Sequence, residues 1–212
     1  LAIKDILENN HHIITCFSRN MHTSPVNLSS ETEITTYVNQ ADNLPDNIII
    51  TCGLLYNAAN RPEKSINSVN KAWLMQSIEA NVLPALYFIK ALTGRLNSSS
   101  QINCAIFSAR VSSISDNKLG GWHSYRMSKC MLNMLIKNTA IEWQVKSPKS
   151  LIFGYHPGTV DTDLSKPFQK KLKPGQLFTK KTAAKYFIDC LSNRTPMHSG
   201  KLFDWQQLEI KP

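Results

Sequence analysis

Unbroken runs of apolar residues are the strongest pattern along this chain of 212 residues. The runs at 47–53, 102–108 and 150–155 show no alternation of apolar and polar positions. Strands that are covered on both faces, as in parallel sheets, have this pattern. Shorter runs at 12–17, which is rich in β-branched residues, and at 201–204 predict two further strands. The chain is therefore expected to form a sheet of buried strands.

Between these runs, apolar residues recur at the spacing of an amphipathic helix. The expected helices are, in chain order, 1–7, one that follows a brief strand at 26–28 and is capped by Ser29 or Ser30, 70–96, 125–145 and 182–191. Glu33 is placed for a capping box on the second of these helices. Pro84 predicts a kink or a boundary within the third, because proline cannot donate the helical hydrogen bond.

The alternation of strands and helices indicates an α/β fold, a doubly wound parallel sheet with helices on both faces. We expect residues 1–212 to form a single domain. Ligands of such sheets bind at the carboxyl ends of the strands. Polar or glycine residues follow four of the expected strands, at Ser18-Arg19, Gly53, Ser112-Ser113 and 156–159. This coincidence predicts a ligand site at that edge of the sheet.

The composition, with 42% hydrophobic residues, is that of an ordinary globular domain. No stretch approaches 18 consecutive apolar residues, so we expect no membrane span, and the charged, amphipathic start is unlike a signal peptide. The five cysteines are widely spaced and mostly lie within apolar runs. This favours buried thiols in a reducing compartment, hence a cytoplasmic protein, over a disulfide framework or a metal site.

The formal net charge of +9 raises the question of nucleic-acid binding. The excess lies late in the chain, in seven lysines between 166 and 185, without the aromatic interleaving of a single-strand binding platform. A positive field that attracts an anionic cofactor or substrate accounts for the same charge. We therefore expect no nucleic-acid partner and keep nucleic-acid binding as a third hypothesis.

Tyr125 and Lys129 are four residues apart, so on a helix they share a face. The ordinary pKa of tyrosine is about 10, and a lysine ammonium one turn away favours the phenolate. Such a pair can act as general acid and base near neutral pH. A serine hydroxyl, from Ser112 or Ser113, could hold a substrate carbonyl while the tyrosine protonates it. On its own, the pair is also what an ordinary surface helix contains.

The segment from Ser112 to Lys129, with Gly120-Gly121-Trp122 inside it, resembles the motifs of the short-chain dehydrogenase/reductase (SDR) family, and within it the C-factor-like or sniffer-like carbonyl-reductase branch. The likeness covers nearly the whole chain, in the family's order, and implies a Rossmann-like fold. It implies a catalytic set of Tyr125, Lys129, Ser113 (with Ser112 as the alternative) and Asn81, the residue that anchors a proton-relay water.

The resemblance also implies a dinucleotide cofactor, and we expect NADP(H) rather than NAD(H). Ser18-Arg19 stands where an acidic residue would hold the ribose 2′-hydroxyl of NAD, and arginine can bind the 2′-phosphate of NADP. The other cofactor contacts that the resemblance implies are Asn27, Leu28, Cys52, Gly53, Tyr125, Lys129, Pro157, Gly158, Thr159, Val160 and Thr162.

Two features depart from the family pattern. The Asn-Asn-Ala-Gly motif after the family's fourth strand is Ile50-Thr51-Cys52-Gly53 here, and the phosphate-binding Gly-x-x-x-Gly-x-Gly is absent. The chain begins without Met, and no N-cap residue precedes its first helix. We therefore expect the domain to be N-terminally incomplete, with a first strand and glycine loop upstream, and a molecule that begins at Leu1 to bind dinucleotide poorly.

The expected activity is reduction of a small ketone or aldehyde, or oxidation of the matching alcohol. The resemblance implies a homodimer or homotetramer that pairs through the two long helices. The alternative is a catalytically weak or inactive family member that acts as a signalling or interaction protein. The altered asparagine motif favours this alternative, and the intact set of Asn81, Ser113, Tyr125 and Lys129 argues against it.

Overall fold

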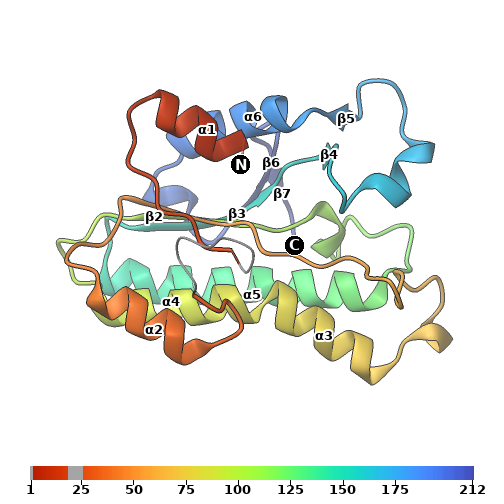
Figure 1. Ribbon diagram of the computed structural model, residues 1–212, viewed down its shortest axis with the longest axis horizontal. Helices are drawn as coiled ribbons and strands as arrows, with labels where there is room; N and C mark the ends of the chain where they lie inside the picture. Colours follow the sequence, from red (N-terminus) through yellow and green to blue (C-terminus); the bar gives the residue numbers. More distant parts are fainter. Residues whose placement is uncertain (1, 19–25) are drawn as a thin grey trace.

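The computed structural model describes residues 2–18 and 26–212 of the chain. Its centre is a sheet in the order β1-β2-β3-β6-β7, in which β7 alone is antiparallel to its neighbour (Figure 1). The strands are β1 (Asn47–Ile50), β2 (Asn103–Phe107), β3 (Leu151–His156), β6 (Leu202–Asp204) and β7 (Glu209–Ile210), with a separate parallel pair of β4 (Thr159–Val160) and β5 (Leu177–Phe178). The four strands expected at 47–53, 102–108, 150–155 and 201–204 are thus confirmed.

Helices cover both faces of the sheet, as the α/β pattern predicts (Figure 1). The helices are α1 (Ala2–Asn9), α2 (Glu31–Gln40), α3 (Lys71–Asn81), α4 (Leu83–Arg95), α5 (His123–Lys146) and α6 (Lys180–Ser192), and the 3-10 helices are η1 (Ile66–Ser68), η2 (Arg110–Ser112), η3 (Lys166–Lys171) and η4 (Pro196–His198). Figure 1 shows α1 and α6 above the sheet and α2 to α5 below it. None of the described helices combines the length and the apolar composition that a bilayer span requires.

The two faces of the sheet explain the unbroken apolar runs. In β3, Ile152 packs into a core formed with α4 and α5, while its neighbour Phe153 packs into a second core formed with α6. Both side chains are fully buried. Successive side chains of a strand point to opposite faces of the sheet. Where helices cover both faces, every side chain is buried, so apolar and polar residues do not alternate along the strand.

Two helix boundaries that Pro84 and Ser30 predict are confirmed. The long helical pattern divides at Val82, where α3 ends and α4 begins, because Pro84 has no N–H for the carbonyl of Ala80. The hydroxyl of Ser30 accepts the N–H of Glu33 at 3.3 Å and caps α2. The capping box is not formed, since the Glu33 carboxylate accepts the N–H of Asn27 instead, at 2.8 Å.

The strand expected at 12–17 is wrong. These residues have no regular secondary structure, and the side chain of Ile13 is 100% exposed. A strand forms only where a neighbour accepts and donates its backbone hydrogen bonds, and no strand of the described residues pairs with this segment. The brief strand expected at 26–28 is also absent, because the Asn27 side chain accepts the N–H of Ser29 and starts a turn.

Candidate active site

Tyr125 and Lys129 lie on the first two turns of α5, which passes beneath the carboxyl ends of β1 and β2 (Figure 1). Both side chains are buried. The Lys129 ammonium donates to the carbonyl of Phe107, the last residue of β2, at 2.9 Å, and more weakly to that of Cys52, just beyond β1, at 3.4 Å. The lysine therefore lies at the carboxyl ends of the parallel strands, where ligands of such sheets bind.

Asn81 joins the loop after β1 to the same helix. Its side-chain oxygen accepts the N–H of Leu54 at 2.5 Å, and its amide donates to the carbonyl of Leu54 at 3.0 Å and to the hydroxyl of Ser128 at 2.8 Å. Ser128 in turn donates to the carbonyl of Tyr125. Asn81, which is 1% exposed, thus connects the end of α3 to the turn of α5 that holds the tyrosine.

The pKa values of the pair differ from what the spacing alone predicts. Burial raises the pKa of Tyr125 to about 12, and burial lowers the pKa of Lys129 to about 8. The expectation that Lys129 brings the pKa of the tyrosine down is wrong for this structure, because desolvation of the phenolate dominates. Among the described residues, no group hydrogen-bonds to the Tyr125 hydroxyl.

The hydroxyls of Ser112 and Ser113 form hydrogen bonds with groups other than Tyr125. The Ser113 hydroxyl accepts the N–H of Asp116 at 3.1 Å and lies 3.3 Å from the Ser115 hydroxyl, so it stabilises its own turn. The Ser112 hydroxyl donates to the carbonyl of Ala109 and accepts the side-chain amide of Asn133. Neither hydroxyl is hydrogen-bonded to Tyr125 in the described part of the chain, so the role of a serine at this site stays a prediction.

Apolar side chains surround Tyr125 instead. Leu55 and Ala109 form a buried cluster with it, and Tyr56, Trp122 and Phe168 pack around the cluster. The Trp122 ring lies 5.0 Å from that of Phe168 and 6.3 Å from that of Tyr125. The Tyr56 hydroxyl donates to the carbonyl of Asp163 at 2.5 Å, which ties the loop after β1 to the loop that carries Phe168. These residues come from four separate segments, and sequence reasoning did not single out Leu55, Tyr56 and Ala109 among them.

The other expected cofactor residues lie at the same edge of the sheet. A Cβ built on Gly53 would stand 3.7 Å from both Asn81 Oδ1 and Lys129 Nζ, so Gly53 and Cys52 adjoin the catalytic candidates. Pro157, Gly158, Thr159, Val160 and Thr162 follow β3 and are all partly exposed. Gly158 has φ +72°, and a Cβ there would meet the Phe178 ring at 2.6 Å, so glycine is required for close packing at this turn.

The residues expected to contact the adenosine end of the cofactor lie near the start of the chain, before α2. Ser18 is described and has no regular secondary structure, whereas Arg19 lies outside the described residues. Asn27 and Leu28 form the turn before α2, and the Asn27 N–H and side chain are already bound within that turn. The basis for choosing NADP(H), the Ser18-Arg19 pair, thus stays a prediction.

A charged cluster borders the site on the side of β6. Arg110, directly after Ala109, donates to the Asp204 carboxylate at 2.6 Å and to that of Asp116 at 3.2 Å. Asp204 is 1% exposed. His156, at the end of β3, faces this cluster, and burial together with the charge of Arg110 lowers its pKa to about 4. His156 is therefore neutral at physiological pH.

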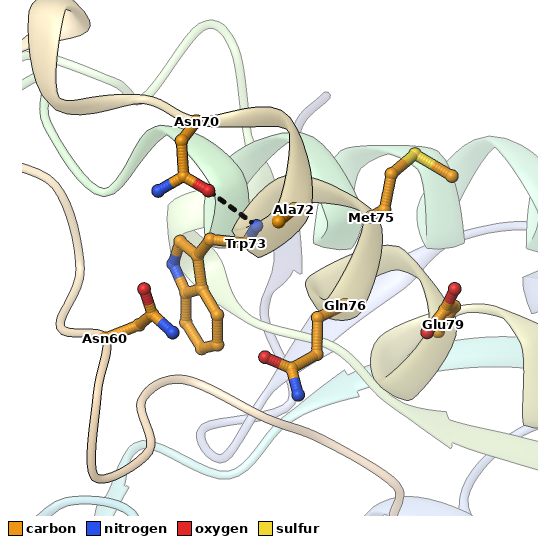
Figure 2. Close-up of a pocket in the computed structure, with 7 residues that line it drawn as sticks. All are labelled: Asn60, Asn70, Ala72, Trp73, Met75, Gln76 and Glu79. Atoms are coloured by element: carbon orange, nitrogen blue, oxygen red, sulfur yellow. Dashed lines mark hydrogen bonds between the residues drawn. The ribbon is translucent and has the colours of Figure 1, made fainter.

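A cavity away from Tyr125 lies on α3. It measures about 360 Å³ and is open to solvent on the outer side of α3, where Asn60, Trp73 and Gln76 line it (Figure 2). Figure 2 shows the Asn70 side chain accepting the N–H of Trp73, an N-cap bond at 2.9 Å, so this polar group is already used by the helix. Within the described residues, no group of His, Cys, Asp and Glu side chains is arranged to hold a metal ion.

Comparison with known proteins finds relatives over most of the chain. A family model described as short chain dehydrogenase matches residues 4–173. The 1-hydroxy-2-glutathionyl-2-methyl-3-butene dehydrogenase of Rhodococcus sp. (strain AD45) is 34% identical over 138 residues, which are 64% of this chain and 57% of that enzyme. C-signal of Myxococcus xanthus is 25% identical over 146 residues, which are 69% of this chain and 82% of that protein. The match thus spans less than two thirds of the length of the Rhodococcus enzyme.

Solved structures share the fold at lower identity. The NADPH-bound carbonyl reductase from chicken fatty liver is 19% identical with a TM-score of 0.74, and covers 99% of this chain and 81% of its own. The carbonyl reductase Sniffer of D. melanogaster is 18% identical with a TM-score of 0.73, and covers 99% of this chain and 82% of its own. Because the family model extends over well above half of the residues and the fold agrees, this chain belongs to the short chain dehydrogenase family.

Proposed function

We propose that this chain is an NADP(H)-dependent oxidoreductase that reduces a ketone or aldehyde, or oxidises the matching alcohol, with Tyr125 as general acid and base. One observation carries the proposal: Tyr125 and Lys129 are buried on adjacent turns of α5, at the carboxyl ends of β1 and β2, with Asn81 bound to both the loop and the helix. Family membership and the similarity to a dehydrogenase and to carbonyl reductases support it.

The division of labour follows from burial and charge. With a raised pKa, Tyr125 is protonated at neutral pH and is ready to donate to a carbonyl oxygen that gains negative charge. Lys129 and Tyr125 would hold the nicotinamide half of the cofactor, beside Cys52 and Gly53. When bound, NADPH supplies the hydride. Asn81 keeps the loop and α5 in register and, as the family resemblance implies, anchors the proton-relay water.

The cofactor choice rests on sequence. Ser18-Arg19 follows the first apolar run, and the residues between Cys16 and Val26 include no acidic side chain to bind the 2′-hydroxyl of NAD. Two similar solved structures hold NADPH or NADP. NADP(H) is therefore the cofactor proposed, with Thr159, Val160 and Thr162 as contacts after β3.

Ser113 remains the serine proposed to hold the substrate carbonyl, but only after a rearrangement. In the described conformation its hydroxyl is bound to the N–H of Asp116, and Ala109 occupies the position beside Tyr125. This bond uses a lone pair of the hydroxyl, so Ser113 can still donate its O–H hydrogen once the hydroxyl turns toward the substrate oxygen.

The surroundings of Tyr125 favour an apolar small molecule. Trp122, Phe168 and Tyr56 present aromatic faces, and the charged residues nearby are already bound. Arg126 donates to the carbonyls of Gly121 and Val111 at 3.0 Å each, which leaves it bound within the protein. An aromatic aldehyde or ketone matches this environment better than an anionic substrate does.

A homodimer or homotetramer is proposed from the outer face of α5. That face exposes apolar side chains at helical spacing, and α3 beside it adds another: Met127, Met131, Met134, Ile141, Val145 and Met75. An exposed apolar stripe of this kind is typical of a helix that pairs with a partner. None of the five cysteines, all of which are described, forms a disulfide, and this supports the proposed cytoplasmic location.

The test compares full-length protein with its Tyr125→Phe variant. NADPH affinity is measured by fluorescence titration, and turnover of an aromatic aldehyde by the loss of absorbance of NADPH. We expect Tyr125→Phe to keep NADPH affinity within about threefold and to lose at least about a hundredfold in turnover, since general acid catalysis contributes that much. Turnover at the level of the unchanged protein would remove Tyr125 from the mechanism.

The competing proposal is a family member without significant catalysis that acts through protein contacts. Ala109 beside Tyr125 favours it, because the alanine side chain has no group that could donate a hydrogen bond to a substrate oxygen. The same titration separates the two proposals. Full-length protein that fails to bind NADPH would support the non-enzymatic one.

A further inference from the structure

Glu63 is a buried carboxylate in a loop that also carries exposed charged residues. It lies in the loop between β1 and α3, follows the exposed Arg61 and precedes the exposed Lys64, yet is itself only 5% exposed. A carboxylate is buried at a high cost unless hydrogen-bond donors compensate for the lost water. The partners of Glu63 therefore indicate what the residue does.

Those partners are at the start of α5, next to Tyr125. The two carboxylate oxygens accept from Ser124, one from its backbone N–H at 3.2 Å and the other from its hydroxyl. The backbone carbonyl of Glu63 accepts the N–H of Trp122 at 2.5 Å. Ser124 is fully buried. The residue thus satisfies three donors of the first turn, 61 positions away in sequence from Ser124.

These bonds replace the cap that α5 lacks. Trp122 occupies the N-cap position with φ +53°, a left-handed conformation, and its side chain makes no capping bond. A left-handed conformation is unfavourable for a non-glycine residue, so neighbouring contacts must hold it. Gly120 and Gly121 before it are also left-handed, and a Cβ on Gly121 would lie 3.3 Å from the Glu63 carbonyl oxygen. The loop of Glu63 is therefore pressed against this turn.

No Lys or Arg of the described residues forms an ion pair with Glu63. The positive charge that balances the carboxylate comes from the N-terminal end of α5, whose free N–H groups attract anions. The site is fully occupied by the protein's own residue. It serves to fix the helix rather than to bind a ligand.

We infer that Glu63 is a positioning residue for the reaction, acting through Ser124 and Trp122 on Tyr125. The inference rests on the proposed function. The carboxylate sets the height and rotation of the first turn of α5, on which Tyr125 follows Ser124 directly. It also holds the backbone of Trp122, whose ring lies 5.0 Å from Phe168 in the wall around the tyrosine. A misplacement of about 1 Å can lower a rate about a hundredfold.

The test uses two substitutions of Glu63 in full-length protein. Glu63→Ala removes both acceptors, and we expect kcat to fall at least about tenfold while the Kd for NADPH stays within about threefold. Glu63→Gln retains the geometry without the charge: its oxygen can accept the Ser124 N–H, and its amide can donate to the Ser124 hydroxyl, which is able to accept. We expect this variant to keep kcat within about threefold of the unchanged protein.

Two controls and one direct measurement complete the test. Glu142→Ala, at an exposed position of the same helix, is expected to leave kcat unchanged. Hydrogen exchange followed by mass spectrometry is expected to accelerate in peptides that span residues 122–126 in Glu63→Ala, and not in Glu63→Gln. Ser124→Ala, which removes only the hydroxyl, is expected to have an intermediate effect on both measurements.

The outcomes separate the inference from the proposed function. Unaltered kcat and unaltered exchange in Glu63→Ala would overturn the inference, as would a loss in Glu63→Gln equal to that in Glu63→Ala. Exchange that rises uniformly over the whole chain would also overturn it, because Glu63 would then act only on global stability. If the unchanged protein binds NADPH but turns over no carbonyl, the proposed function fails, and the exchange at 122–126 still decides whether Glu63 positions the helix.

Discussion

Asn81→Ala tests the connection between the loop after β1 and the helix of Tyr125. The substitution removes one side chain that holds both the N–H and the carbonyl of Leu54 and also donates to Ser128. Alanine preserves the end of α3, because it is a better helix former than asparagine. The change therefore isolates the three hydrogen bonds.

The magnitude follows from the burial of the three partners. The hydroxyl of Ser128 is completely buried but keeps its bond to the Tyr125 carbonyl, whereas the Leu54 backbone is partly buried and loses both its partners. At about 1 kcal/mol for each bond, we expect the free energy of unfolding to fall by about 3 kcal/mol. For a chain of this size, 1 kcal/mol shifts the melting temperature by about 2–4 °C, so a decrease of about 6–12 °C is expected.

Urea unfolding followed by tryptophan fluorescence measures the difference, with Asn138→Ala as the control. Asn138 is exposed on α5, and its substitution is expected to change the free energy of unfolding by less than about 0.5 kcal/mol. The kcat of Asn81→Ala should fall as well, since the loop and α5 lose their common anchor. A loss of stability no larger than that of Asn138→Ala would refute the reasoning.

Three further predictions concern pH, catalysis and assembly. Burial lowers the pKa of Lys129 to about 8, so between that pH and the ordinary value of 10.5 the unfolded chain binds a proton that the native chain does not. The free energy of unfolding should therefore rise with pH in this window relative to Lys129→Met, and parallel curves for the two proteins would contradict the buried lysine. Ala109→Ser places a hydroxyl beside Tyr125 and should raise kcat/KM for an aromatic aldehyde at least about tenfold, because a fully preorganised donor contributes about a hundredfold or more. An unchanged rate would show that the hydroxyl does not reach the substrate oxygen. Met131→Glu should shift the protein to a smaller species in sedimentation velocity, whereas Met197→Glu, at an exposed site on η4, should not. Identical behaviour of the two variants would exclude the α5 face as the interface.

The elements that the pattern predicted well are those decided by local rules or by burial on both faces. β1, β2 and β3 are unbroken apolar runs because helices cover each side of the sheet. Pro84 marks the boundary of α3 and α4, and Ser30 caps α2, because each effect operates within four residues. The segment 12–17 failed because pairing with a neighbouring strand is not a property of the segment itself.

The sequence predicted the candidate residues on α3 and α5. It did not predict the residues that surround them. Tyr125 and Lys129 lie one turn apart on α5, and Asn81 is hydrogen-bonded to Ser128 of the same helix. The pKa of Tyr125 is raised by burial, and the four-residue spacing to Lys129 gives no information about burial. Nothing in the sequence marks Glu63 as part of the site, since its partner Ser124 is 61 residues away.

The serine assignment shows the same limit. Ser113 has the sequence position of a catalytic residue, yet its hydroxyl is bound to the N–H of Asp116, three residues away. Serines compete for nearby backbone groups in turns, and this competition decides where the hydroxyl points. Ala109, which lies beside Tyr125, carries no polar atom on its side chain that would mark it as part of a site.

The central claim is that full-length protein transfers hydride between NADPH and a carbonyl under the control of Tyr125. The most direct measurement uses NADPH deuterated at the nicotinamide C4 with an aromatic aldehyde, followed by mass spectrometry of the product alcohol. We expect deuterium on the carbinol carbon with the unchanged protein and at least about a hundredfold less labelled product with Tyr125→Phe. An absence of labelled alcohol with the unchanged protein, or equal labelling with both proteins, would contradict the account.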